Sequence, residues 1–137
     1  MATFNKFNQF TADLLAGKHN FSSHIFKIML TNVAPTAANA VKADLTEIAS
    51  GSGYSGGGTA TTITATTSGG IAKIAGTDVT FTSTGSIGPF RYAVLYNETS
   101  SGQPLVAWWD YGSSTTLLVN EIMTVDFSAS NGIFTVT

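Results

Sequence analysis

The stretch that decides the fold reads PFRYAVLYN at residues 89–97 and PLVAWWDY at residues 104–111. Apolar side chains alternate along the first segment and occupy both of its faces. A strand with two apolar faces is typical of the centre of a sandwich, where both faces are covered. Residues 98–103 include Gly102 and join the two segments over a short turn, so the sequence predicts a β-hairpin here.

Shorter strand-like segments lie on both sides of this hairpin. Residues 24–31 place Phe26, Ile28 and Leu30 on one side with a period of two. Further candidate strands lie at residues 61–67, 71–75, 78–83, 121–127 and 133–137. We therefore expect a single, mainly β domain over residues 1–137. Its predicted architecture is an antiparallel β-sandwich or jelly-roll-like barrel of about seven or eight strands, with one N-terminal α-helix.

The helix is predicted at about residues 3–17. Phe4, Phe7, Phe10 and Leu14 recur at spacings of three and four, which is the period of an amphipathic helix. Thr3 can serve as the N-cap, and Gly17 as the stop signal. Such an apolar stripe either covers the chain's own sheet or docks against a neighbouring subunit.

Few side chains are charged. The chain has six basic and eight acidic residues, and charged residues make up 10% of it, whereas about 25% is usual. Hydrophobic residues make up 43%, which excludes disorder and leaves apolar surface that needs covering. Charge is depleted at the centres of protein interfaces. The composition therefore favours a subunit of a larger assembly, and we expect a homo-oligomer.

Other partner classes are not expected. The charges are scattered singly, so no basic patch is available for nucleic acid or for an anionic membrane. No apolar run approaches the length of about 18 residues that a membrane span needs. The first residues lack the pattern of a signal peptide, so we expect the protein to stay in the cytoplasm in which it is made.

Cofactor and metal motifs are weak. Residues 51–56 read GSGYSG and match a dinucleotide fingerprint, but a Thr-rich β stretch follows where a helix should begin. We therefore interpret residues 50–59 as a surface loop, either mobile or ordered against a neighbour. His19 and His24 have no Cys or acidic residue at a metal-ligand spacing, and the chain contains no Cys. The sequence predicts no cofactor, no metal site and no small-molecule substrate, and two histidines that bond locally.

Two carboxylates deserve comparison with a glycosidase site. Asp110 and Asp126 lie on candidate strands, and strand alternation places Trp108 on the face of Asp110. An aromatic ring beside a carboxylate can hold or cleave a sugar, but a strand-end Asp can also bond turn amides at residues 112–114. Arg91, the chain's only arginine, is predicted to pair with Asp110 or Asp126, within the chain or across an interface. We predict no enzymatic activity.

Aromatic residues are concentrated on the hairpin. Large aromatic side chains are enriched at interface centres, and core packing explains only one face of these strands unless the other face is also covered. The predicted interface residues are Phe4, Phe7, Phe10 and Leu14 from the helix, Tyr54 from the glycine loop, and Arg91, Trp108, Trp109 and Tyr111 from the hairpin.

Several blocks resemble a family of small structural proteins of tailed bacteriophages. They are MATFNKFNQF at residues 1–10, MLTNVAPTAANAVKADLTEIASGSGY at residues 29–54, GPFRYAVLYN at residues 88–97, WWDYGSS at residues 108–114 and VDF at residues 125–127. The resemblance runs through essentially the whole chain and is specific in the combination of blocks. It implies a virion component that is assembled in the host bacterial cytoplasm, and it implies no catalytic residue.

Among virion roles, the resemblance favours a capsid decoration (cement) protein. Such proteins commonly bind the major capsid protein as trimers at the local symmetry axes of the shell and stabilise the head. The alternatives are a tail or head–tail connector subunit, or a carbohydrate-binding module that contacts the host surface.

Overall fold

The computed structural model describes residues 3–137. Its largest unit is an antiparallel five-stranded sheet in the order β1-β8-β7-β2-β3. The strands of this main sheet are β1 (Thr3–Lys6), β2 (Phe26–Thr31), β3 (Thr59–Thr61), β7 (Ile87–Asn97) and β8 (Leu105–Leu117). The predicted hairpin is present, because β7 and β8 are antiparallel neighbours with Val94 opposite Trp108.

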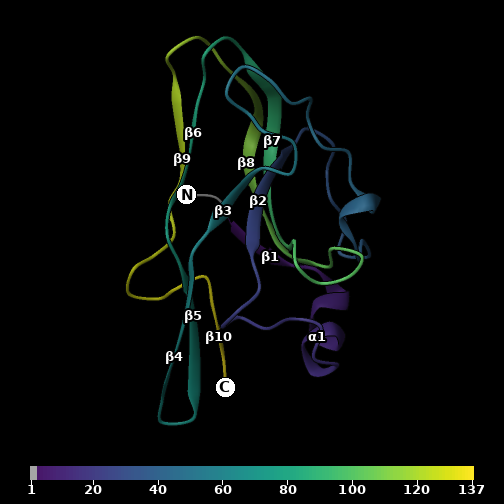
Figure 1. Cartoon of the computed structure of the whole chain (residues 1–137), viewed down its shortest axis with the longest axis vertical. Coiled ribbons are helices and arrows are strands. Elements are labelled where there is room, and N and C mark those ends of the chain that lie inside the picture. Colours follow the sequence, from purple (N-terminus) through teal and green to yellow (C-terminus); the bar gives the residue numbers. More distant parts are fainter. Residues whose placement is uncertain (1–2) are drawn as a thin grey trace.

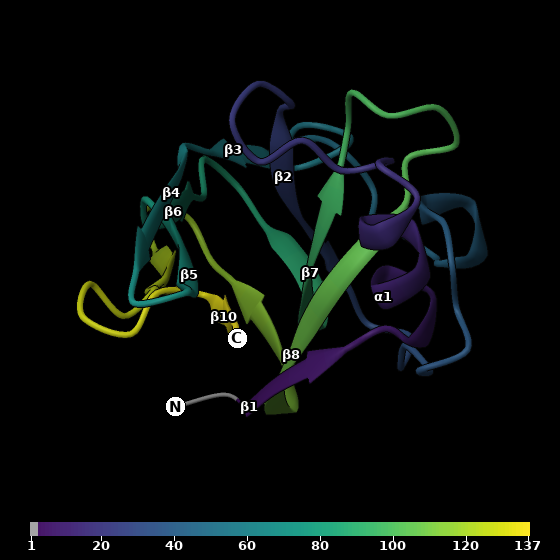
Figure 2. The ribbon, with the colours of Figure 1, turned by 90° about the horizontal axis from the view of Figure 1, so that it is seen from below.

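Two smaller sheets cover one face of the main sheet (Figure 2). One contains β4 (Ile63–Ser68), β5 (Ile71–Gly76) and β10 (Phe134–Val136), and the other contains β6 (Val79–Thr82) and β9 (Ile122–Val125). Figure 1 shows them end to end along the long axis, with β6 and β9 in the upper half and β4, β5 and β10 in the lower half.

The opposite face of the main sheet is covered by part of residues 32–58, including the short 3-10 helix η1 (Lys42–Asp44) (Figure 2). The helix α1 (Asn8–Leu15) lies toward one end of the molecule (Figure 1), where its Phe10 and Leu14 pack on the side of the small sheets. Consequently β7 is buried on both faces, as its sequence predicts. Ala93 and Leu95 belong to the large core beneath the small sheets. Val94 and Tyr96 belong to a second core with Phe7.

The predicted fold class is confirmed: the protein is mainly β, with antiparallel sheets in a sandwich-like arrangement, and residues 3–137 contain one α-helix. The same residues contain ten strands, more than the seven or eight predicted. The two additional strands are short: β1 has four residues and β3 has three. A segment of that length is too short to display a periodic pattern.

The predicted start of the helix at residue 3 is wrong. Thr3–Lys6 forms β1, with Phe4 opposite Trp109, and Phe7 rather than Thr3 is the N-cap residue of α1. Residues an odd number apart point to opposite faces of a strand, so Phe4 and Phe7 fit an extended chain as well as a helix. Phe4 packs beside the large core and Phe7 inside the second core. The helix is therefore half the predicted length and ends at Leu15.

The glycine-rich loop at residues 50–59 packs onto its own chain rather than projecting from it. Gly58 has a φ of +81°, and a Cβ atom at this position would overlap the carbonyl oxygen of Ile28 in β2. Only glycine tolerates both the left-handed conformation and this close approach. The loop is thus fitted to the main sheet through Gly58 and Tyr54, while most of its other residues lie at the surface, as predicted.

Candidate functional site

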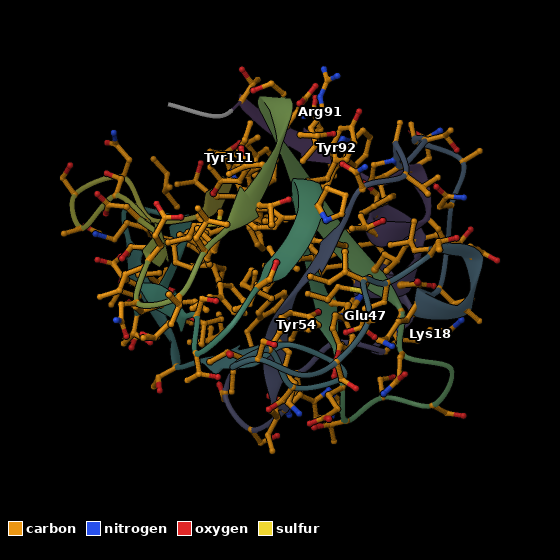
Figure 3. All side chains as sticks on the ribbon, turned by 90° about the horizontal axis from the view of Figure 1, so that it is seen from above. Lys18, Glu47, Tyr54, Arg91, Tyr92 and Tyr111 are labelled. Carbon is orange, nitrogen blue, oxygen red and sulfur yellow. The ribbon has the colours of Figure 1, made fainter. Side chains whose placement is uncertain are left out.

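Arg91 on β7 and Asp110 on β8 form a bidentate ion pair. Arg91 Nε lies 2.7 Å from Asp110 Oδ1, and Arg91 Nη2 lies 3.0 Å from Oδ2. The prediction that Arg91 pairs with one of two carboxylates is confirmed for Asp110. The Arg91 guanidinium and the backbone N–H of Gly112 hold the pKa of Asp110 below its usual range. The pair is about one-third exposed, and Figure 3 shows Arg91 near the edge of the molecule.

Trp108 and Trp109 lie on opposite faces of β8. The ring of Trp108 is centred 4.5 Å from that of Phe7, on the face of the main sheet that the small sheets leave uncovered. The ring of Trp109 is centred 5.8 Å from Phe4 and 5.6 Å from Phe127, beneath the small sheets. Trp109 is 9% exposed, so most of its surface is buried by its own chain and is not available to a partner.

A groove of about 500 Å³ opens between β8 and the C-terminal part of the chain. We call it the aromatic groove. It is lined by Phe4, Trp109, Tyr111, Thr124, Val125, Asp126, Phe127, Ser128, Gly132 and Ile133. The two carboxylates proposed for sugar chemistry are thus separated in role: Asp126 lines the groove, whereas Asp110 is held by Arg91. Burial raises the pKa of Tyr111, whose side chain remains 38% exposed.

A second, smaller pocket of about 330 Å³ lies where β1, α1 and β10 meet. We call it the helix pocket. It is lined by Phe4, Lys6, Phe10, Thr11, Leu14, Phe134, Thr135, Val136 and Thr137. Three predicted interface residues, Phe4, Phe10 and Leu14, therefore meet here. Phe7 does not, because its side chain is fully buried in the second core.

The turn from β8 to β9 carries apolar side chains into solvent. Leu118, Val119 and Ile122 are 61%, 58% and 61% exposed. We call residues 118–122 the apolar turn; it lies at the top of Figure 1, beyond the ends of β6 and β9. Sequence reasoning missed it, because LLV after a strand is also the pattern of a core segment. The signal that could have found it is Asn120-Glu121, a turn-forming pair directly after these apolar residues.

Tyr54, a predicted interface residue, is buried inside the chain. Its hydroxyl donates to Glu47 Oε2 at 2.6 Å and accepts from the backbone N–H of Leu30 at 3.0 Å. Glu47 also accepts from the N–H of Gly57 and pairs with Lys42 at 3.0 Å. Burial, together with the hydrogen bond to Glu47, raises the pKa of Tyr54. Figure 3 labels Tyr54 and Glu47, which lie close to each other, and the bond from Leu30 ties the glycine loop to β2 of the main sheet.

His19 and His24 meet at one amide. Asn97 Nδ2 lies 3.1 Å from His19 Nδ1 and 2.9 Å from His24 Nδ1, while Asn97 Oδ1 accepts from the N–H groups of Thr99 and Ser100. Burial lowers the pKa of His19 to about 4. The predicted local bonding is confirmed for His24, whose Nδ1 also accepts from the backbone N–H of Asn20 at 3.2 Å. It is wrong for His19, which bonds to Asn97, a residue distant in the chain. Within residues 3–137, no cluster of three His, Cys, Asp or Glu side chains could hold a metal ion.

None of the family models, curated proteins or solved structures compared with the chain matches it. The described helices of residues 3–137 are too short and too polar to cross a membrane.

Proposed function

We propose that the chain is a non-catalytic structural subunit of a tailed-phage virion and serves as a capsid decoration protein. The phage assignment is supported by the combination of sequence blocks that resembles small phage structural proteins. The decoration role is supported by a charged fraction of only 10%, which suits a chain whose surface is largely covered by other subunits. In this proposal the protein lies on the head and contacts the major capsid protein, as a trimer.

The observation that carries an assembly role is the apolar turn. Leu118, Val119 and Ile122 are each more than half exposed. One exposed apolar side chain is ordinary on a protein surface, but three in the same turn form a patch that needs an explanation. They stand together at one end of the molecule (Figure 1), beyond the cores of the sandwich. An ordered group of large aliphatic side chains at a protruding end is typical of a contact with another subunit.

The test is made on particles of a phage whose genome encodes the chain. Deleting the gene is expected to yield heads that rupture at a lower temperature, and adding the purified protein is expected to restore the wild-type threshold. A reconstruction of the particle should place the protein on the outer shell. A position at the neck or tail would replace the decoration role by the connector or tail-subunit alternative. Its absence from the particle would reject a virion role altogether.

The aromatic groove favours one alternative function, the binding of a sugar. Tyr111 presents a partly exposed ring, and Asp126 adds a carboxylate that can accept hydrogen bonds from hydroxyl groups. Ligand pockets commonly combine an apolar wall with a few polar groups that fix orientation. From the sequence alone, the sugar hypothesis is based on Trp108 and Asp110 rather than on these residues. In the structure Trp108 packs against Phe7, and Asp110 forms an ion pair with Arg91.

A glycan array tests this alternative. Binding that is lost in Tyr111→Ala and retained in Tyr111→Phe would support a ring-stacking site. Val33→Ala is a suitable control, because Val33 is 56% exposed and does not line the groove. An array without hits would reject the alternative.

A further inference from the structure

We propose that copies of this chain associate head to tail, with the apolar turn of one copy seated in the helix pocket of the next. The inference rests on the proposed assembly role, and it names the surfaces through which the subunits join. It is independent of whether the assembly is a phage head.

The apolar turn is already fixed in shape before it meets a partner. The backbone N–H of Leu118 donates to Glu121 Oε1 at 2.7 Å, and the N–H of Glu121 donates back to the carbonyl of Leu118 at 3.0 Å. Two further backbone bonds tie the turn to Ser83: Asn120 N–H to Ser83 O at 2.8 Å, and Ser83 N–H to Glu121 O at 2.9 Å. Because the turn is preorganised, binding would cost little ordering entropy.

The helix pocket has the size and lining to receive such side chains. Its volume is about 330 Å³, far more than a single water molecule needs. Its walls are mostly apolar, with Phe10 and Leu14 on one side and Phe134 and Val136 on the other. Val136 is 42% exposed and is the accessible apolar residue of the lining, beside the exposed polar residues Lys6, Thr11, Thr135 and Thr137.

Charge favours this pairing. Lys6 is the one charged side chain in the described lining of the helix pocket, and its Nζ bonds only to the hydroxyl of Thr11 among the described residues. Glu121 stands at the base of the apolar turn with one carboxylate oxygen bonded to Leu118 N–H. Seating the turn in the pocket would bring this carboxylate toward Lys6.

The competing arrangements lack this complementarity. A symmetric contact between two apolar turns would press two convex surfaces together and face Glu121 with its own copy. Seating the turn in the aromatic groove would bring Glu121 toward the carboxylate of Asp126. Like charges brought together across an interface disfavour it.

The two surfaces lie toward opposite ends of the molecule. Figure 1 places the apolar turn at the top and the elements of the helix pocket, β10 and α1, in the lower half. A contact between two different surfaces is heterologous, so it either closes into a ring or continues as a filament. A closed ring of three would agree with the predicted trimer.

A mixing experiment with two variants tests the contact. Leu118→Asp disables the turn but leaves the pocket, whereas Val136→Asp disables the pocket but leaves the turn. Both sites are exposed, so both variants should fold, which circular dichroism and thermal unfolding verify. Val33→Asp is the matched control, because Val33 is 56% exposed and belongs to neither surface.

Sedimentation over a concentration series gives the readout. The wild type and Val33→Asp are expected to associate, and each disabling variant to weaken association by at least about tenfold. A mixture of Leu118→Asp with Val136→Asp should form a one-to-one dimer that grows no further, because only one functional turn and one functional pocket remain. Glu121→Gln keeps the bond from Leu118 N–H but removes the negative charge. Self-association of this variant should be weaker than that of the wild type and should depend less on salt concentration.

Three results would overturn the contact: a wild type that stays monomeric at millimolar concentration, association that survives Val136→Asp, or a mixture that stays monomeric. Failure of the proposed function is distinguishable from these results. A monomeric chain that still binds shells would overturn the head-to-tail contact alone. An associating chain that is absent from virions would overturn the decoration role alone.

Discussion

Trp108 and Trp109 are neighbours in the chain but lie in two different cores. Trp108 packs on Phe7 in the second core, and Trp109 packs on Phe4 in the large core beneath the small sheets. The main sheet is therefore the shared middle layer of the molecule. This placement explains the aromatic richness of the hairpin without a partner, because both faces of the hairpin are covered by its own chain.

Trp109→Ala is expected to lower the free energy of unfolding by about 3–5 kcal/mol, because it removes a large buried ring from a packed core. Tyr111→Ala, two residues further along the same face, should cost far less, since Tyr111 is 38% exposed. Urea unfolding of both variants measures the difference. Equal losses would contradict the assignment of Trp109 to the core.

Gly58→Ala is expected to destabilise the protein by more than about 2 kcal/mol. The cost has two sources: the left-handed backbone at φ +81°, and the overlap of the new Cβ with the carbonyl oxygen of Ile28. Gly69→Ala is the control, because Gly69 has a φ of +59° with nothing within 4 Å of the added atom. It should cost only about 1–2 kcal/mol. Similar thermal shifts for the two variants would show that the glycine loop does not press against β2.

The hairpin and its ion pair could be predicted from sequence because both depend on residues close together in the chain. Strand alternation determines which side chains of residues 93–96 share a face, although a register shift between Phe90 and Tyr92 places Phe90 in the large core, where simple alternation would not put it. Arg91 has few carboxylates within reach. The strand at Thr3–Lys6 could not be predicted, because Phe4 and Phe7 satisfy helical and extended spacing alike.

The two pockets were beyond sequence reasoning for a different reason. The helix pocket joins Phe4 and Leu14, which come from the first two elements, with Val136 from the last strand, more than a hundred residues further along the chain. Tyr54 reads as an exposed loop aromatic, and only the fold brings Leu30 and Glu47 to its hydroxyl. A site that is assembled by tertiary contacts produces no recognisable local pattern in the amino-acid sequence.

Arg91→Gln is expected to raise the pKa of Asp110 toward its ordinary value. The guanidinium is the main cause of the lowered pKa, and the Gly112 N–H is the second. Because Gly112 still donates to Asp110 in the variant, the pKa should not return completely. Carboxyl-detected NMR titration measures it. An unchanged pKa would mean that Gly112 alone holds the carboxylate.

Stability is expected to fall as the pH drops from about 6.5 to about 4. Burial holds the pKa of His19 near 4 in the folded chain, against 6.5 for an ordinary histidine, so between these values the unfolded state binds more protons. The contribution of neutral His19 to the free energy of unfolding is therefore fully present above pH 6.5, and it is lost as the pH falls toward 4. The loss amounts to about 3 kcal/mol once the pH is below both values.

The hydrogen bonds of Asn97 point the same way. Because Oδ1 of Asn97 accepts from Thr99 and Ser100, its Nδ2 must donate to His19 Nδ1, and a protonated imidazole cannot accept that bond. Urea unfolding at pH 7.5, 6.0 and 5.0 measures the slope, in a range where carboxylates contribute less. His19→Gln should remove most of that slope, even if the variant is less stable at every pH. A slope that persists in His19→Gln would assign the acid sensitivity to another group.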